Sequence, residues 1–176
     1  MAKLKAGVIG LGMGWGHLAG YMEHPDVEVV AVADRIEAKR ENAKKEFNLP
    51  KVYAEGIDMI RNEKLDILSV AVPNNQHREL TIAGLEAGAN VLCEKPMALG
   101  MEEIHEMQRL AREQGVLLLE GYMYRCHPQT AKLVELLKAG AVGRVRSVEG
   151  AFSFRSEFNP ASRLFDPALG GGAIWD

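Results

Sequence analysis

The sequence has 176 residues, a formal net charge of −3, and a composition of 47% hydrophobic and 26% charged residues. Acidic and basic residues are interleaved, which excludes the basic stripe of a nucleic-acid-binding protein, and no apolar run reaches the roughly 18 residues of a membrane span. The two cysteines, Cys93 and Cys126, belong to no cluster with metal-ligand spacing. We therefore expect a cytoplasmic protein that binds no nucleic acid, membrane or metal.

The first predicted strand, 4–10, leads into a glycine-rich turn and a helix that begins at about His17. The candidate cofactor-binding residues of this turn are Gly10, Gly12, Met13 and Gly14. Gly10 permits a tight turn, and Gly12 lets the backbone approach a pyrophosphate at the helix N-terminus. The usual third glycine position is Trp15, so either the turn is one residue shorter or Gly16 provides the close helix packing.

The second predicted strand, 27–33, ends at an acidic residue. Asp34 follows Gly12 by 22 residues, close to the spacing of the acid that accepts the ribose hydroxyls of a dinucleotide. A carboxylate there repels a 2′-phosphate and favours NAD, whereas the neighbouring Arg35 keeps NADP possible. The motif therefore predicts a bound NAD or NADP.

Apolar runs and helical periodicities alternate as far as residue 120. Further strands are predicted at 52–53, 66–72, up to Cys93, and 116–119, and helices at 36–46, 56–62, 76–87 and 101–114. Such alternation predicts an α/β fold, a Rossmann-type doubly wound parallel sheet with right-handed crossovers.

The rhythm changes after Glu120, where a helix from Pro128 to about 139 and a long strand over 145–154 are predicted. We interpret these elements as the start of a second α+β domain. The expected division is an NAD(P)-binding domain over 1–122 and an incomplete substrate and oligomerisation domain over 123–176. The 145–154 strand would present an open edge that pairs with another chain, so we expect a homo-oligomer.

A Glu-Lys-Pro sequence follows the strand that ends at Cys93. Ligands bind beyond the carboxyl ends of parallel strands, and an isolated buried charge is costly, so Glu94 and Lys95 are candidate site residues. The alternative is a surface salt bridge where the strand meets a loop.

Four sequence blocks together resemble the Gfo/Idh/MocA oxidoreductases, the family of glucose-fructose oxidoreductase and inositol dehydrogenase. The blocks are residues 10–12, 71–77, 94–96 and 170–176. The resemblance implies a nicotinamide-dependent enzyme that transfers hydride to or from a hydroxyl of a sugar, cyclitol or cyclic diol. Its partners would be these small-molecule substrates.

The resemblance also implies roles for individual residues. Lys95 would hydrogen-bond the reacting hydroxyl, and Asp176 would help hold the substrate and tune proton transfer. His77 would lie near the nicotinamide side of the cofactor, with Pro73 and Asn74 along the loop that the cofactor passes. A further His or Tyr is expected four residues after Asp176, beyond the end of the sequence.

Two other functions remain open at this point. The chain could be a dinucleotide-binding module without turnover, because the last expected catalytic partner is missing from the sequence, or an NAD-binding regulator. In the enzyme hypothesis Lys95 acts as a base only when neutral, which a positive nicotinamide and partial burial favour and the Glu94 carboxylate opposes.

Overall fold

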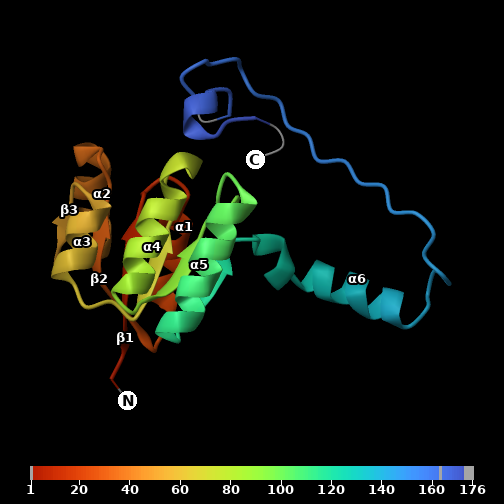
Figure 1. Ribbon diagram of the computed structural model, residues 1–176, viewed down its shortest axis with the longest axis horizontal. Helices are drawn as coiled ribbons and strands as arrows, with labels where there is room; N and C mark the ends of the chain where they lie inside the picture. Colours follow the sequence, from red (N-terminus) through yellow and green to blue (C-terminus); the bar gives the residue numbers. More distant parts are fainter. Residues whose placement is uncertain (1, 163, 173–176) are drawn as a thin grey trace. The chain divides into compact units, whose positions relative to one another are not determined.

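The computed structural model describes residues 2–162 and 164–172 (Figure 1). Its contacts divide the chain into two compact units. One unit comprises the residues up to Gly121 together with the described part of 161–176, and the other is Tyr122–Pro160. The first unit carries the sheet and the described site residues.

A six-stranded parallel sheet forms the centre of the first unit, in the order β3-β2-β1-β4-β5-β6. The strands are β1 (Leu4–Ile9), β2 (Val27–Ala33), β3 (Val52–Tyr53), β4 (Ile67–Val70), β5 (Asn90–Cys93) and β6 (Leu118–Glu120). The predicted doubly wound Rossmann-type sheet is therefore confirmed. The strand order reverses between β1 and β4, and ligands of such folds bind at that switch point.

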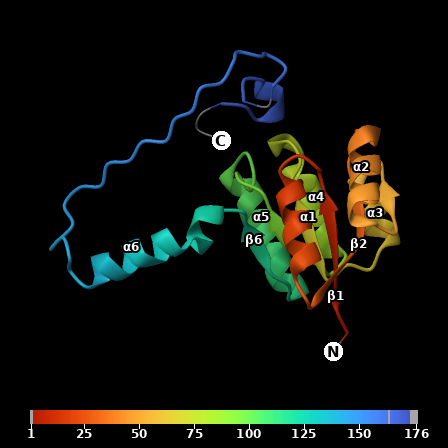
Figure 2. The same ribbon diagram turned by 180° about the vertical axis from the view of Figure 1, so that it is seen from behind.

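Helices cover both faces of the sheet because its strands are apolar on both sides. They are α1 (Gly14–Glu23), α2 (Glu37–Phe47), α3 (Gly56–Asn62), α4 (His77–Glu86) and α5 (Met101–Gln114), with the short 3₁₀ helix η1 (Asn74–Gln76) before α4. Figure 1 shows α4 and α5 in front of the sheet. Figure 2, the opposite view, shows α1 in front of it, so α1 covers the other face. The predicted helices are confirmed within a few residues at each end.

Two hydrophobic cores result, one on each face. Leu18 of α1 and Ala43 of α2 pack with Val8 and Val32 on one face. The core on the other face is larger and collects side chains from α3, α4 and α5, among them Met59, Leu85 and Met107, around Leu68, Val70 and Cys93. The sheet is thus fixed from both sides, and its carboxyl edge becomes a rigid base for loops.

The second unit contains the 3₁₀ helix η2 (Met123–Cys126) and the helix α6 (Pro128–Lys138). The predicted strand over 145–154 is wrong, since that segment has no regular secondary structure and Val148 and Phe152 are 85% and 92% exposed. Alternating apolar residues form a strand only beside a partner that takes up their backbone N–H and C=O groups, and no described strand pairs with this segment.

In the part of the chain that the structure describes, no helix is both long enough and apolar enough to cross a bilayer.

Candidate functional site

The glycine-rich turn between β1 and α1 brings the backbone close to β4. Gly10 has φ of +90°, and a Cβ on it would lie 2.3 Å from the Ala71 carbonyl oxygen, so only glycine fits. A Cβ on Gly14 would lie 2.9 Å from Val8 Cγ1, whereas one on Gly16 would meet nothing within 4 Å. The turn is therefore one residue shorter than the usual pattern, and Gly14 provides the close helix packing.

The same turn leaves room for a phosphate group. Within the described residues, a Cβ on Gly12 would come within 4 Å of the Lys39 ammonium alone, at 3.9 Å, apart from its chain neighbours. Met13 is the N-cap of the ten-residue helix α1 and makes no side-chain capping hydrogen bond, and the first turn carries no acidic residue. Free N–H groups and the helix dipole there favour an anion. These residues fit the pyrophosphate of a dinucleotide.

Asp34 joins the end of β2 to the glycine-rich turn. Its Oδ2 accepts a hydrogen bond of 2.7 Å from the Leu11 backbone N–H, and its Oδ1 accepts one of 2.8 Å from Ile36 N–H. The Lys39 ammonium lies 4.0 Å from Oδ2. Arg35 instead forms an exposed ion pair of 3.1 Å with Glu55.

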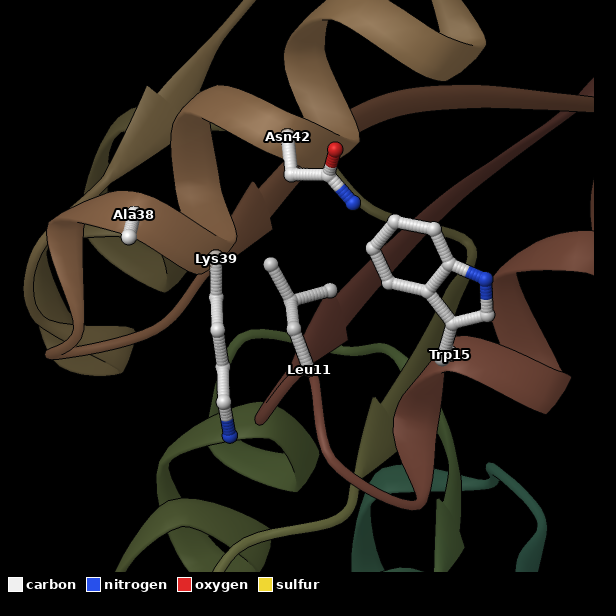
Figure 3. A pocket seen from close by; sticks show the side chains of 5 residues that line it. All are labelled: Leu11, Trp15, Ala38, Lys39 and Asn42. Carbon is white, nitrogen blue, oxygen red and sulfur yellow. The ribbon is translucent and has the colours of Figure 1, made fainter.

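A shallow pocket opens between α1 and α2 beside this turn (Figure 3). It is lined by Leu11, Trp15, Ala38, Lys39 and Asn42. Trp15 packs against Phe47 with ring centroids 5.2 Å apart, which holds the indole on the α1 side of the pocket. An apolar, partly aromatic wall next to an anion site suits a flat heterocycle joined to a phosphate.

His77 lies beneath the loops that follow β4 and β5. The imidazole is only 1% exposed, with Nδ1 2.7 Å from the Pro96 carbonyl oxygen and Nε2 2.8 Å from that of Val72. Each ring nitrogen therefore faces a backbone carbonyl, one from each loop. The side chain thus ties the two loops together from inside.

The loop after β4 also receives the segment 161–172. Asn74, which is buried, donates from Nδ2 to the Gly170 carbonyl at 3.0 Å, and Asn75 donates to the Ala168 carbonyl at 2.9 Å. Pro73 directly precedes Asn74 at the start of η1. The glycine-rich segment that leads towards Asp176 therefore lies against the predicted cofactor loop, while Asp176 itself lies outside the described residues.

Glu94 is paired with a histidine that the sequence interpretation did not include among the site residues. Its Oε1 lies 2.9 Å from Nε2 of His17 on α1, and its Oε2 accepts the Lys95 backbone N–H at 3.2 Å. Burial raises the pKa of the Glu94 carboxyl, but the His17 hydrogen bond and charge and the Lys95 N–H outweigh it and leave the pKa below its usual value. The sequence contained one indication of such a residue, because a buried carboxylate such as that of Glu94 requires a hydrogen-bonding or charged partner.

The loop that carries Lys95 is fixed at several points. Glu94 is anchored to His17, the Pro96 carbonyl accepts from His77, and Met97 N–H donates to Glu120 Oε1 at 2.8 Å. Lys95 is half-buried between these anchors. The alternative of an exposed Glu94–Lys95 salt bridge does not fit a carboxyl group that is 6% exposed and bound to α1.

The structure thus gathers most predicted site residues at the carboxyl edge of the sheet. The glycine-rich turn, Asp34, and the loops of Asn74 and Lys95 all follow the ends of strands β1, β2, β4 and β5. Among the described residues, no group of three His, Cys, Asp or Glu side chains is arranged to hold a metal ion. The arrangement places the glycine-rich turn, the Asp34 carboxylate and Lys95 along one edge.

Comparison with known proteins agrees with this geometry. Residues 4–122 match the family profile described as "Oxidoreductase family, NAD-binding Rossmann fold" (GFO_IDH_MocA). The chain is 32% identical over 171 residues to the D-xylose 1-dehydrogenase (NADP(+)) 2 of Haloferax volcanii, a match that covers 97% of this chain and 52% of that protein. It is 34% identical over 144 residues to the trans-1,2-dihydrobenzene-1,2-diol dehydrogenase of Mus musculus, covering 82% and 43%.

A similar solved structure is the scyllo-inositol dehydrogenase from Lactobacillus casei with bound cofactor NAD(H) and scyllo-inositol. The TM-score is 0.75 at 26% identity, and the match covers 80% of this chain and 42% of that one. The chain spans about half the length of the curated relatives that it matches. It belongs to the Gfo/Idh/MocA oxidoreductases, and residues 4–122 form their NAD-binding Rossmann domain.

Proposed function

We propose that this protein is an NAD(P)-dependent dehydrogenase or reductase that transfers hydride between the nicotinamide and a hydroxyl carbon of a sugar, cyclitol or cyclic diol. The substrate class is supported by relatives named for D-xylose and a dihydrobenzene diol and by a similar structure that holds scyllo-inositol. The observation that carries the proposal is Lys95, which is held by anchored neighbours on the same sheet edge as the glycine-rich turn.

Different residues of this edge would bind different parts of the cofactor. Gly12, Met13 and Gly14 would receive the pyrophosphate, and Asp34 the adenosine ribose. The loop of Pro73 and Asn74 and the loop of Glu94 and Lys95 would flank the nicotinamide end. A bound nicotinamide supplies the hydride chemistry, and the protein supplies position and electrostatics.

Lys95 would exchange the proton of the reacting hydroxyl. In the oxidative direction the O–H proton would pass to Lys95 Nζ while the substrate C–H bond gives its electron pair as hydride to the bound oxidised nicotinamide, which leaves a carbonyl. In the reductive direction the Lys95 ammonium returns that proton. His77 and Glu120 hold the backbone of Pro96 and Met97, directly after Lys95, so they would act as positioning residues for its side chain.

We further propose that residues 1–122 act as the cofactor domain and that 123–176 begin a substrate domain. Asp176 is the proposed second catalytic group, which would hold the substrate near Lys95. A chain that binds the coenzyme without turnover is the competing function.

Two measurements separate these functions. Calorimetric titration with NAD⁺ and NADP⁺ tests coenzyme binding, and an absorbance assay at the reduced nicotinamide band with D-xylose, inositols and cyclic diols tests turnover. Binding with turnover supports the dehydrogenase, binding without turnover supports the binding module, and no binding of either coenzyme contradicts both.

The role of Lys95 is tested by Lys95→Met, which keeps an unbranched chain as far as Cε and removes the amine that carries the proton. We expect turnover to fall roughly 10²- to 10⁴-fold, as when a general base is lost, with coenzyme affinity nearly unchanged. The matched control is Lys64→Met, at an exposed lysine preceding β4. Loss of coenzyme binding in Lys95→Met would instead make Lys95 a structural or cofactor-holding residue.

A further inference from the structure

His17 reaches from helix α1 to the loop that carries Lys95. It belongs to the first turns of α1, the helix whose N-terminus is the expected phosphate site. Its Nε2 lies 2.9 Å from Glu94 Oε1, and the two side chains are only 17% and 8% exposed. The imidazole therefore joins the glycine-rich turn to the end of β5 by a contact that solvent and salt screen little.

The Glu94 carboxylate is confined by α1, by its own loop and by the residue after β6. Its Oε1 faces His17, and its Oε2 accepts the Lys95 backbone N–H at 3.2 Å. A Cβ on Gly121 would lie 3.1 Å from Oε1, so the backbone beyond β6 packs closely against the carboxylate. The orientation of this carboxylate therefore determines where the Lys95 N–H is held.

The His17 ring is directed at Glu94 and is not fully satisfied elsewhere. The pKa of the Glu94 carboxyl stays below its usual value despite burial, so the group is an ionised acceptor and the shared hydrogen lies on His17 Nε2. Among the described residues, His17 Nδ1 is buried without a hydrogen-bond partner. Such an atom costs stability, so the contact with Glu94, rather than packing, accounts for a histidine at this position.

We propose that His17 is a positioning residue for the hydride transfer, because by holding Glu94 it fixes the backbone of Lys95 and so the place of the lysine amine. The inference rests on the proposed function, since it presumes that Lys95 exchanges a proton with a substrate at this sheet edge. His17 acts through Glu94 and touches no reacting atom. Its loss is therefore expected to lower kcat rather than coenzyme affinity.

The first test compares kcat and the coenzyme Kd of the wild type with those of His17→Leu and His17→Gln. Leucine fills a similar volume without a hydrogen-bond donor, whereas the glutamine amide can place an N–H near the position of Nε2. We expect kcat to fall roughly ten- to 100-fold in His17→Leu, with Kd changed less than about twofold, and His17→Gln to retain most of the turnover. The control is His105→Leu, at an exposed histidine on α5, which should change neither quantity.

A double variant separates positioning from stability. His17→Leu combined with Glu94→Met replaces both buried partners by apolar side chains of similar size, which can restore stability because no unpaired charge stays buried. It still removes the acceptor of the Lys95 N–H, so we expect kcat to stay as low as in His17→Leu while the urea midpoint of unfolding recovers. Recovery of turnover together with stability would show that His17 is only structural and would overturn the inference.

Amide hydrogen exchange gives a second measurement that needs neither coenzyme nor turnover. The Lys95 N–H donates to Glu94, whereas the Met97 N–H donates to Glu120. In His17→Leu we expect the exchange rate of Lys95 relative to that of Met97 to rise about tenfold, the effect of one lost charge-assisted hydrogen bond. An unchanged ratio would mean that the substitution loosens the whole loop equally, which contradicts the inference.

The outcomes also separate this inference from the proposed function. A wild type with turnover beside a His17→Leu variant that is equally fast overturns the inference and leaves the dehydrogenase function intact. The same holds where weaker coenzyme binding accounts for the whole effect of His17→Leu. A wild type that binds coenzyme but turns over no substrate overturns both.

Discussion

At the scale of single residues, the pair of His17 and Glu94 shows how the sheet edge is held. Glu94 sits at the end of β5 and His17 in the first helix, so their 2.9 Å contact joins the lysine loop to the glycine-rich turn. A buried carboxylate without such a partner would be costly. Sequence reasoning identified Glu94 from its place after a buried strand, but the partner is 77 residues away and only the fold brings it there.

Replacing His17 should change how the free energy of unfolding depends on pH. The pKa of Glu94 is lowered in the folded protein, so its contribution to stability is present above the pKa of the unfolded chain and is lost as the pH falls through the folded pKa. In His17→Leu burial would raise the Glu94 pKa instead. We expect a loss of roughly 1–3 kcal/mol in the free energy of unfolding at neutral pH, shrinking as the pH falls and Glu94 becomes protonated.

Urea denaturation across the acidic range measures this difference. His105→Leu is the control, at an exposed histidine on α5, and should give a difference that does not depend on the charge of Glu94. A stability deficit of the same size at every pH in His17→Leu would show that the histidine acts by packing alone.

At the scale of elements, the connection between β1 and α1 depends on which glycine lies against the sheet. Sequence alone left Gly14 and Gly16 as equal candidates, because both fall near the expected third glycine and spacing does not reveal distance to β4. The structure places Gly14 in contact with Val8 and Ala71 and leaves Gly16 exposed. The short turn therefore brings α1 close to the strands that form the switch point.

Alanine at these two glycines should have opposite effects. Gly14→Ala puts a methyl group 2.9 Å from Val8 Cγ1 and 3.2 Å from Ala71 Cβ, so we expect a loss of about 1–3 kcal/mol in the free energy of unfolding. Gly16→Ala meets no neighbour and adds helix propensity, so we expect a gain of up to about 1 kcal/mol. Chemical denaturation of both variants decides this, and a destabilised Gly16→Ala beside an unaffected Gly14→Ala would reverse the assignment.

At the scale of the whole molecule, the sheet and its helices could be predicted from the hydrophobic periodicity of the sequence. Each apolar strand segment is followed by residues with helical spacing or by residues typical of turns. The prediction of a strand at 145–154 was wrong because a strand depends on more than its local pattern. Its pattern required a partner strand, and pairing is a property of the surrounding fold that no local pattern contains. The contacts of Asn74 and Asn75 with residues 168–170 were likewise beyond sequence reasoning, since they join segments more than 90 residues apart.

The central claim is that a dinucleotide lies across the carboxyl edge of this sheet with its pyrophosphate against Gly12. The most direct test compares coenzyme binding to the wild type and Gly12→Val by calorimetry. Among the described residues, and apart from its two chain neighbours, a Cβ at Gly12 comes within 4 Å of the Lys39 ammonium alone, so we expect valine there to occupy the phosphate position while the fold is kept. Gly16→Ala is the matched control.

We predict an unchanged free energy of unfolding for Gly12→Val and a loss of coenzyme affinity of about 100-fold, equivalent to two charge-assisted hydrogen bonds. Gly16→Ala should bind as the wild type does. Undiminished binding of NAD⁺ and NADP⁺ to a folded Gly12→Val would contradict the account.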